Sequence, residues 1–379
     1  TTDGADTLTV TAGGASASST IADTSQTPAV TAQTFNLTVG VDQGTAFTGD
    51  TAGDSFVAAD SGANTTWTTN DVVDGAAGSD TFLVSRAAAI TVPTGAEVKN
   101  IESVTFVSGG AVTANTTAWT GATSVSSTGV GAATLTAAAT TDVTASSTTQ
   151  AAGAISIDGG KDVTSTSTGA TSGTVTVGAT TAPAGAVNVT YTNTYADTVG
   201  ATTDTGGAIA VTGGTTVTVT SNQATGTPDD GADIGVIGAI SVTGKATTTA
   251  ATVIQTAASA KTATASGVKN GAVTIADLNS TSTTKAQTIA EATLTNYGNS
   301  TITSGALTTV NISGKGGTLG ITNNLTAPAS TALTINANGL AYVNAGSNNA
   351  VTVDAVYKTL TIDSSTAAST VADLTSSGI

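Results

Sequence analysis

A short phrase recurs through the middle of this 379-residue chain and limits what the chain can fold into. It reads Gly-Ala-Ile-Ser-Ile-Asp-Gly-Gly at 153–160, Gly-Ala-Ile-Ala-Val-Thr-Gly-Gly at 207–214 and Gly-Ala-Ile-Ser-Val-Thr-Gly-Lys at 238–245, with looser copies at 185–189 and 271–275. Each copy alternates β-branched apolar residues with small polar ones and then closes on a turn. The phrase therefore predicts a brief strand with one apolar face.

The spacing of the copies predicts how such strands are used. The copies begin roughly 20 to 35 residues apart, which is the range of periods typical of solenoids and arrays. One short strand cannot bury its apolar face alone, so its neighbours must stack on it. We therefore expect an all-β fold, a β-solenoid of mainly parallel β-helix type.

Similar alternation predicts further strands along the chain. These are expected at Thr174–Val177, Val187–Tyr191, Thr216–Thr220, Thr301–Thr303, Leu333–Ile335, Val351–Val353 and Leu360–Ile362. Asparagines at 323–324, 336, 338 and 348–349 are expected at corners, in left-handed turns and with side chains stacked between rungs.

Composition fits a narrow core better than a wide globular one. Aromatic residues make up 3% of the chain, methionine is absent, and the apolar residues are mostly Ala and Val. Such small side chains fill the thin interior of a β-helix. A disordered Ser/Thr-rich linker is the alternative, but disorder does not require the regular Val/Ile alternation.

Residues 36–86 differ from the rest because they are rich in Asp. Through position 85 the chain carries ten Asp and no basic residue. Seven of these acids fall in this one stretch: Asp42, Asp50, Asp54, Asp60, Asp71, Asp74 and Asp80. Asp is the short oxygen donor that turns and calcium loops favour, so the stretch is a candidate calcium-binding segment.

Two segments of this stretch share a pattern. Gly-Asp-Thr-Ala-Gly-Asp-Ser-Phe-Val occupies 49–57 and Gly-Ala-Ala-Gly-Ser-Asp-Thr-Phe-Leu occupies 75–83. The second is close to the Gly-Gly-x-Gly-x-Asp-x-U-x repeat of calcium-binding β-rolls, in which U is large and apolar. In that reading Gly49, Gly75 and Gly78 permit tight turns with inward carbonyls, and Asp54 and Asp80 supply anionic oxygens.

Both copies depart from the repeat, and a simpler interpretation stays open. Asp50 and Ala76 replace the second Gly, and Ala52 replaces the third Gly of the first copy. The copies are also 26 residues apart, so we do not expect them to hold ions between adjacent turns. The alternative is a pair of Asp-Gly turns with no metal. Mutual repulsion among clustered acids favours calcium.

Other acids extend the list of candidate calcium ligands. Asp158 lies at the turn of the first repeated phrase, and two longer acidic loops interrupt the later strands. These loops carry Asp197 and Asp204, and Asp229, Asp230 and Asp233. Loops that leave a solenoid usually share one face. They are either solvated surface or sites that hold calcium within or between subunits.

The residue types that are missing or scarce exclude several functions. Without Cys or His the chain has no thiol chemistry, no disulfide, no Ser-His-Asp triad and no zinc site built on sulfur or imidazole. Arg86 is its one Arg and its eight Lys are scattered, so an enzyme on a β-helix, such as a polysaccharide lyase, is not expected. A formal charge of −16 disfavours nucleic acid as a partner.

The order of these phrases resembles a known family. The Asp-Gly segments, the phrase Asn-Ile-Glu-Ser-Val-Thr-Phe-Val at 100–107 and the Gly-Ala-Ile/Val repeats are similar to surface-layer (S-layer) proteins of the calcium-dependent, RTX-related Caulobacter type. The likeness covers most of the chain and is closest at 153–178, 271–275 and 305–314, with Asn338-Gly339-Leu340 after them.

The resemblance implies a structural protein and not an enzyme. Members of that family are exported by a type I system from Gram-negative bacteria, fold outside the cell on binding calcium, and tile the outer membrane as a two-dimensional lattice. The expected partners are therefore calcium ions and other copies of this chain. Lipopolysaccharide would be held only through a further domain of a longer protein.

We accordingly expect three regions and keep one functional alternative. The regions are a lead-in strand or linker at 1–35, the RTX-like segment at 36–86, and a β-helix with acidic loop insertions at 87–379. The alternative is a secreted, calcium-stabilised β-solenoid that acts as an adhesin or as an ice-binding module. Regularly stacked Thr pairs without bulges would favour ice binding, and an irregular ladder would favour ordinary polar surface.

Overall fold

The computed structural model describes most of the chain, and the described part is all-β as predicted. It describes residues 6–21, 30–60, 64–148, 154–169, 173–194, 203–224, 233–259, 267–342, 350–364, 369–370 and 374–376. Within these ranges the only helical element is one 3₁₀ turn, η1 (Gly44–Phe47). Two long parallel sheets make up the body of the molecule, which is the predicted solenoid.

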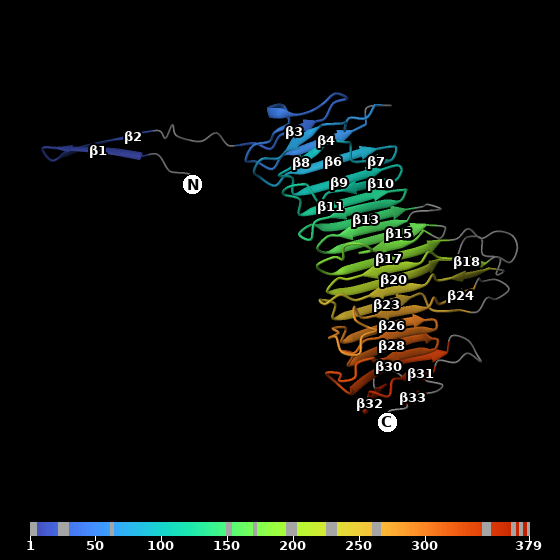
Figure 1. The fold of residues 1–379 in the computed structure, drawn as a ribbon. Helices are drawn as coiled ribbons and strands as arrows, with labels where there is room; N and C mark the ends of the chain where they lie inside the picture. The colour runs from blue at the N-terminus through green and yellow to red at the C-terminus, as the bar shows by residue number, and fades with distance from the viewer. Residues whose placement is uncertain are drawn as a thin grey trace.

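The larger sheet has 14 strands stacked along the long axis (Figure 1). Its strands are, in order, β3 (Thr34–Asn36), β4 (Ser55–Ala59), β6 (Thr81–Arg86), β9 (Ser103–Ser108), β11 (Ser124–Gly129), β13 (Asp142–Thr148), β15 (Val163–Gly169), β17 (Val187–Thr194), β20 (Thr216–Ala224), β23 (Ala250–Gln255), β26 (Glu291–Tyr297), β28 (Thr309–Gly316), β30 (Ala332–Tyr342) and β32 (Thr359–Asp363). Because β3, β4 and β6 lead into β9, the Asp-rich segment forms rungs of this same sheet.

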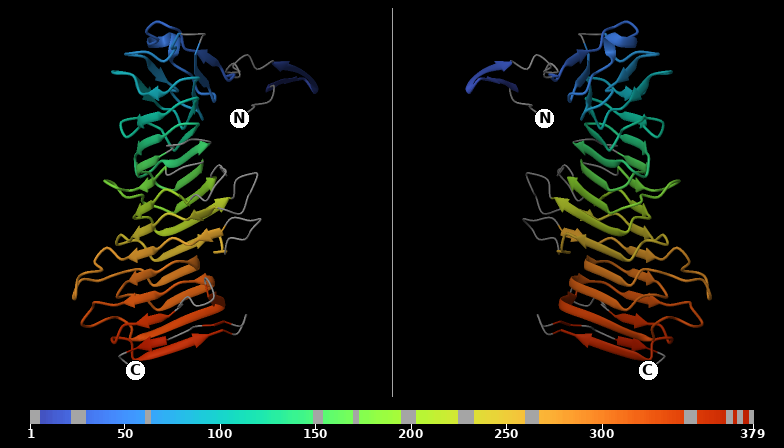
Figure 2. Two further views of the ribbon diagram at one scale, coloured as in Figure 1. Left: turned by 90° about the vertical axis from the view of Figure 1, so that its right-hand side faces the viewer. Right: turned by 90° about the vertical axis from the view of Figure 1, so that its left-hand side faces the viewer.

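The second sheet has 12 parallel strands. They are β7 (Ile90–Thr91), β10 (Val112–Asn115), β12 (Ala133–Ala137), β14 (Ile155–Gly159), β16 (Val175–Val177), β19 (Ile209–Thr212), β22 (Ile240–Thr243), β25 (Val273–Ala276), β27 (Ser300–Thr303), β29 (Leu319–Thr322), β31 (Val351–Val353) and β33 (Leu374–Ser376). From β6 onward a strand of one long sheet alternates with a strand of the other, so most rungs contain one strand from each long sheet (Figure 2).

Smaller elements complete the molecule. Two short parallel sheets join β5 (Val72–Asp74) to β8 (Glu97–Lys99), and β18 (Thr203–Thr205) to β21 (Ile234–Val236) and β24 (Gly267–Lys269). An antiparallel hairpin of β1 (Asp6–Ala12) and β2 (Ala15–Ile21) belongs to neither long sheet. In the described residues we find no helix with the length and apolar character that crossing a membrane requires.

Alternation of side chains explains why these sequences form rungs. In β20 every second residue is buried, beginning with Val217 and Val219. Val187 and Val217 share one register position with Val163, so one apolar column runs through successive rungs. Since successive strand side chains point to opposite faces, the small polar residues between them face outward. The fold thus follows from the alternation of apolar and polar residues, which recurs in every second position of one strand after another.

The repeated phrase behaves largely as predicted. Copies at 153–160, 207–214, 238–245 and 271–275 supply β14, β19, β22 and β25 of the 12-stranded sheet, in which β16 lies between β14 and β19. The looser copy at 185–189 falls instead in β17 of the larger sheet. All seven further strands predicted from alternation are present.

The prediction of left-handed corners was wrong for Asn323, Asn324, Asn336 and Asn338, and the predicted corner at 348–349 lies outside the described residues. Among the described residues outside glycine, positive φ occurs at Asn70, Ala76, Asn100 and Asn296. Asn336 lies within β30, where its Nδ2 donates to Asn311 Oδ1 at 2.7 Å. Stacking between rungs is therefore correct for Asn336, and the left-handed backbone is supplied by other residues.

Candidate functional site

Three carboxylates stand one above another where the first strands of the larger sheet begin. Asp54, Asp80 and Glu102 directly precede β4, β6 and β9, and we call them the acid ladder. Asp80 Oδ1 accepts from the backbone N–H of Asp54 at 2.6 Å, and Glu102 Oε2 accepts from that of Asp80 at 2.7 Å. The backbone N–H of each aspartate thus binds the carboxylate of the next rung.

The ladder corrects one expectation about the two Asp-Gly motifs. Their interval of 26 residues is one complete rung, so Phe56 pairs with Phe82 and the two turns are neighbours. We had expected that interval to keep the turns from being adjacent. A rung here consists of two strands and their connections, and that whole circuit sets the spacing between stacked turns.

Glycine is needed where the turns approach each other. A Cβ on Gly75 would lie 2.1 Å from the backbone oxygen of Asn100 and 2.5 Å from Asp80 Oδ2. A Cβ on Gly49 would likewise lie 2.4 Å from Asp54 Oδ2. These distances are far below van der Waals contact, so glycine is what lets each carboxylate fold back against its own turn.

The second turn departs from the ideal motif at a strained position. Ala76 adopts φ +63°, in the left-handed region that glycine favours. Its backbone N–H donates to Asp74 Oδ1 at 3.0 Å, which holds the turn closed. Gly78 adopts φ +148°, and a Cβ there would lie 2.1 Å from the backbone oxygen of Ala52 on the preceding turn.

The middle member of the ladder is electrostatically the least satisfied. Asp80 is 1% exposed, and its Oδ2 has no hydrogen-bond partner. Burial raises the pKa of the Asp80 carboxyl, and repulsion from Glu102, Asp54 and Asp50 raises it further, while the Asp54 N–H opposes the shift. Asp54, by contrast, accepts from Gln33 N at 2.7 Å and from Asp50 N at 2.9 Å.

Asp42 and Asp71 form a second, separate column. Asp42 accepts from the N–H and the hydroxyl of Thr38, at 2.6 and 2.8 Å. Asp71 accepts from the N–H of Asp42 at 2.9 Å and from Thr68. Both aspartates are almost fully buried, and their oxygens close local turns in the way Asp commonly does.

The other two acids of these turns are more accessible. Asp50 accepts from Ala52 N at 2.7 Å and from the side chain of Gln33 at 2.8 Å. Asp74 accepts from Asn100 Nδ2 at 2.8 Å in addition to Ala76 N. Their carboxylates therefore also bond to backbone and amide groups of neighbouring turns.

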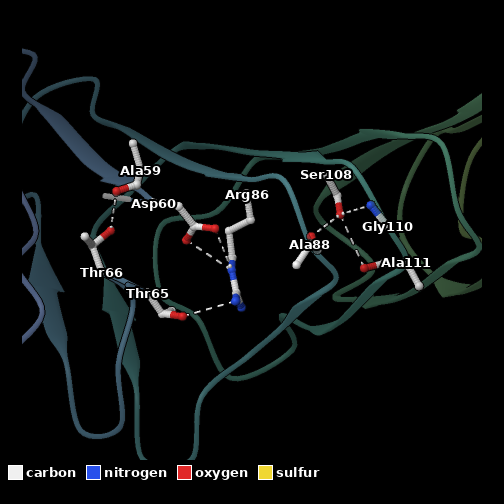
Figure 3. Close-up of polar contacts among 9 residues, drawn as sticks. All are labelled: Ala59, Asp60, Thr65, Thr66, Arg86, Ala88, Ser108, Gly110 and Ala111. Carbon is white, nitrogen blue, oxygen red and sulfur yellow. Dashed lines mark hydrogen bonds and ion pairs between the residues drawn. The ribbon is translucent and has the colours of Figure 1, made fainter. Parts of the chain in front are cut away.

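Asp60 lies apart from the ladder, at the opposite end of β4. Its carboxylate forms an ion pair with Arg86, whose Nε is 3.2 Å from Asp60 Oδ1 (Figure 3). The Arg86 guanidinium also donates to the Thr65 hydroxyl at 3.1 Å. The one Arg of the chain thus neutralises this acid, which separates Asp60 from the other calcium candidates.

The more distant candidates are dispersed along the solenoid. Asp158 accepts from the backbone N–H of Thr180 at 2.8 Å. Asp204 accepts from Asn193 Nδ2 at 3.0 Å, and Asp233 is buried just before β21. The remaining candidates, Asp197, Asp229 and Asp230, lie outside the described residues.

The donor set has the chemistry of a hard-cation site, but carboxylates alone do not complete one. Within the described ranges, no three acidic side chains gather closely enough to hold a metal ion. Beside Gly75, however, the partnerless Asp80 Oδ2 and the Asn100 carbonyl oxygen both border the volume that a Cβ would fill. Calcium accepts carboxylate, carbonyl and water oxygens, so these groups fit it chemically.

Two acids important to the structure were missed from the sequence. Glu102 completes the ladder 22 residues after Asp80, and rung spacing could have identified it. Asp277 is buried, and its Oδ2 accepts from Thr288 N and Ile289 N at 2.7 Å each and from the Ser304 hydroxyl at 3.0 Å. Its sequence context offers no comparable signal, because the donors come from distant turns.

Comparison with known proteins leaves the chain without a family assignment. No protein-family model matches it, and no curated protein sequence matches it significantly.

Proposed function

We propose that this chain is a structural protein whose copies assemble into a calcium-dependent two-dimensional array on the outer surface of a Gram-negative cell, after type I export. The observation that supports the proposal best is the position of the Asp-Gly turns. They stack at one end of a long parallel solenoid and place the acid ladder on its first rungs. A catalytic role does not explain this repetition.

Calcium has a defined role in the proposal. Asp80 Oδ2, with the Asn100 carbonyl beside it, would hold the ion, and water would complete the coordination. The ion would offset the repulsion that Glu102, Asp54 and Asp50 exert on the Asp80 carboxylate. The backbone N–H of Gln33, which donates to Asp54, and that of Asp54, which donates to Asp80, would keep the two carboxylates in place whether or not the ion is bound.

Assembly follows from the character of the surface. The outward residues of both sheets are mostly Thr, Ser, Asn and Asp, and the one Arg is already paired with Asp60. Such a surface lacks the aromatic and Arg anchors that usually supply tight binding. An array does not require tight single contacts, because each copy binds several neighbours at once. Divalent ions at acidic seams would convert repulsion into attraction.

The outward Thr ladder supports ordinary polar surface better than ice binding. Paired outward threonines occur on β12 at 134 and 136 and on β27 at 301 and 303. The same column holds Ala210 on β19 and Gly320 on β29. In the larger sheet the register also shifts near Thr295 and near Ser313. An ice-binding face needs an unbroken array of matched pairs.

The test is assembly of the purified chain with calcium and with chelator. Electron microscopy and light scattering should show ordered arrays or large oligomers with calcium and monomers with EGTA. A matched magnesium sample controls for simple charge screening. A chain that stays monomeric at high calcium and high protein concentration would refute the array, and the calcium-stabilised adhesin would then be the better proposal.

A further inference from the structure

We propose that a groove beside Trp119 binds a neutral saccharide. The groove has a volume of about 630 Å³ and lies between β8 and the turn that follows β10, near the N-terminal end of the solenoid. This volume is within the range of small-molecule sites. Its walls are Val92, Pro93 and Gly95–Lys99 on one side and Asn115 and Ala118–Thr120 on the other. This binding is independent of the array proposed above.

The aromatic wall is rigid and offers a donor. Trp119 is partly buried, and its ring is braced by Trp67 and Phe106, each at a centroid distance of 6.2 Å. No described residue accepts a hydrogen bond from its indole N–H. A braced, partly exposed indole that lines a groove and has an unbonded N–H can supply both apolar contact and a directed hydrogen bond. The apolar face of a pyranose ring and its hydroxyl groups match that combination.

Polar groups around the ring can recognise hydroxyls. Asn115 Oδ1 accepts from the N–H and the hydroxyl of Thr117, at 3.1 and 2.7 Å, which fixes the amide. Its Nδ2 has no partner among the described residues, and the side chain is exposed. Asn115 therefore presents a second fixed donor at the edge of the groove, as small-ligand sites commonly do.

The charges of the groove favour a neutral ligand. Glu97 and Lys99 lie on the same face of β8, and their side chains pair at 2.5 Å. This contact raises the pKa of Lys99, and the opposite charges of the two side chains offset each other at this edge of the groove. The pair therefore leaves little net charge on this wall of the groove. The chain is strongly acidic as a whole, and this further disfavours anions.

Both walls are fixed before a ligand arrives. Gly95 adopts φ +75°, and a Cβ there would lie 2.3 Å from Asn70 Oδ1, so this turn is packed tightly against the preceding rung. Across the groove, Thr120 N donates to Val98 O, and its hydroxyl accepts from Asn100 N at 3.0 Å. A preformed site loses little conformational entropy when it binds a ligand, which favours affinity.

The test uses the two indole N–H signals of the whole chain in a ¹H–¹⁵N NMR titration. The probes are cellohexaose, maltohexaose and chitohexaose, and a Trp67→Phe variant assigns the signals. We expect at least one sugar to shift the Trp119 signal with a Kd of about 0.1–1 mM, with a much smaller change at Trp67. Retention on insoluble cellulose or chitin would identify a polymer surface, rather than free chains, as the source of the sugar.

Variants of groove residues test whether the sugar binds in the groove. Trp119→Ala should weaken binding at least about 30-fold, and Asn115→Ala about three- to tenfold. Thr113→Ala, on the same strand but outside the groove, should bind like the parent. Because Trp119→Ala also removes contacts to core aromatics, Asn115→Ala with an unchanged melting curve is the decisive variant. Normal affinity in that variant would overturn the proposal. So would no shift with any sugar, or a shift only with a proline-rich peptide.

Discussion

Replacing Asp80 by Asn separates its structural role from metal binding. In the parent, Asp80 Oδ1 accepts from Asp54 N at 2.6 Å, while Oδ2 is buried without a partner. Asparagine keeps an acceptor for Asp54 and removes the negative charge from among Asp50, Asp54 and Glu102. Its amide N–H can also reach towards the Asn100 carbonyl, because Asp80 Oδ2 and that oxygen both lie beside Gly75.

These contacts predict how stable the parent, Asp80→Asn and Asp80→Ala are relative to one another, and calcium should reverse the order of the parent and Asp80→Asn. Asp80→Ala loses a charge-assisted hydrogen bond of about 1.5–3 kcal/mol, partly offset by relief of repulsion. Without calcium, Asp80→Asn should therefore be at least as stable as the parent, and Asp80→Ala less stable. Calcium at 100 times its Kd should stabilise the parent by about 2.7 kcal/mol and should leave both variants nearly unchanged.

Hydrogen exchange followed by mass spectrometry measures the local stability of this turn with and without calcium, on peptides that cover residues 49–57. A local measurement is preferable because repeat arrays do not always unfold in a single step. If calcium protects the Asp80→Asn variant as much as the parent, or protects neither, then Asp80 holds no ion. An Asp80→Asn variant that is less stable than the parent without calcium would instead contradict the repulsion argument.

Three further predictions test the turns and the buried acids. Ala76→Gly should stabilise the chain by about 1 kcal/mol in urea unfolding, because φ +63° strains alanine; unchanged or lower stability would contradict that reading. Asp277→Ala should cost about 3–5 kcal/mol by leaving three donors around a buried position unpaired. Asp162→Ala should have a much smaller effect, because Asp162 is half-exposed and accepts one backbone N–H, that of Ala186; equal losses would refute the distinction. Because its pKa is raised, Asp80 binds its proton more tightly in the folded state. Without metal, the parent should therefore gain stability relative to Asp80→Asn as the pH falls through the raised pKa of Asp80 towards 3.8. Parallel curves of stability against pH for the two proteins would argue against a raised pKa at Asp80.

The fold was largely predictable from the sequence because its cause is local. Apolar residues at every second position, such as Val187 and Val189, give each strand one apolar face. Because many strands repeat this face, they bury it by stacking on one another. Register between distant strands then follows from keeping Val163, Val187 and Val217 in one column. The choice of sheet for the copy at 185–189, the short sheets beside the two long ones and the positions of the left-handed turns needed the structure.

The site was less predictable, because its geometry depends on what lies one rung away. The sequence indicates which acids are close along the chain, but not that Asp54 N–H bonds to Asp80. Burial of Asp42 and Asp71 was equally hidden, because backbone N–H groups satisfy them in the folded state only. The groove at Trp119 joins a loop to a strand of the preceding rung, so no linear motif marks it.

The direction of the hydrogen bonds has a mechanical consequence. Each strand of the two long sheets pairs only with the rungs directly before and after it, so the interstrand bonds point along the long axis. Tension applied along that axis would open one ladder at a time from an end, and the rungs behind it would keep their pairing. A molecule built in this way yields gradually under load and lengthens as it does so, which lets it absorb a sudden pull without breaking as a whole.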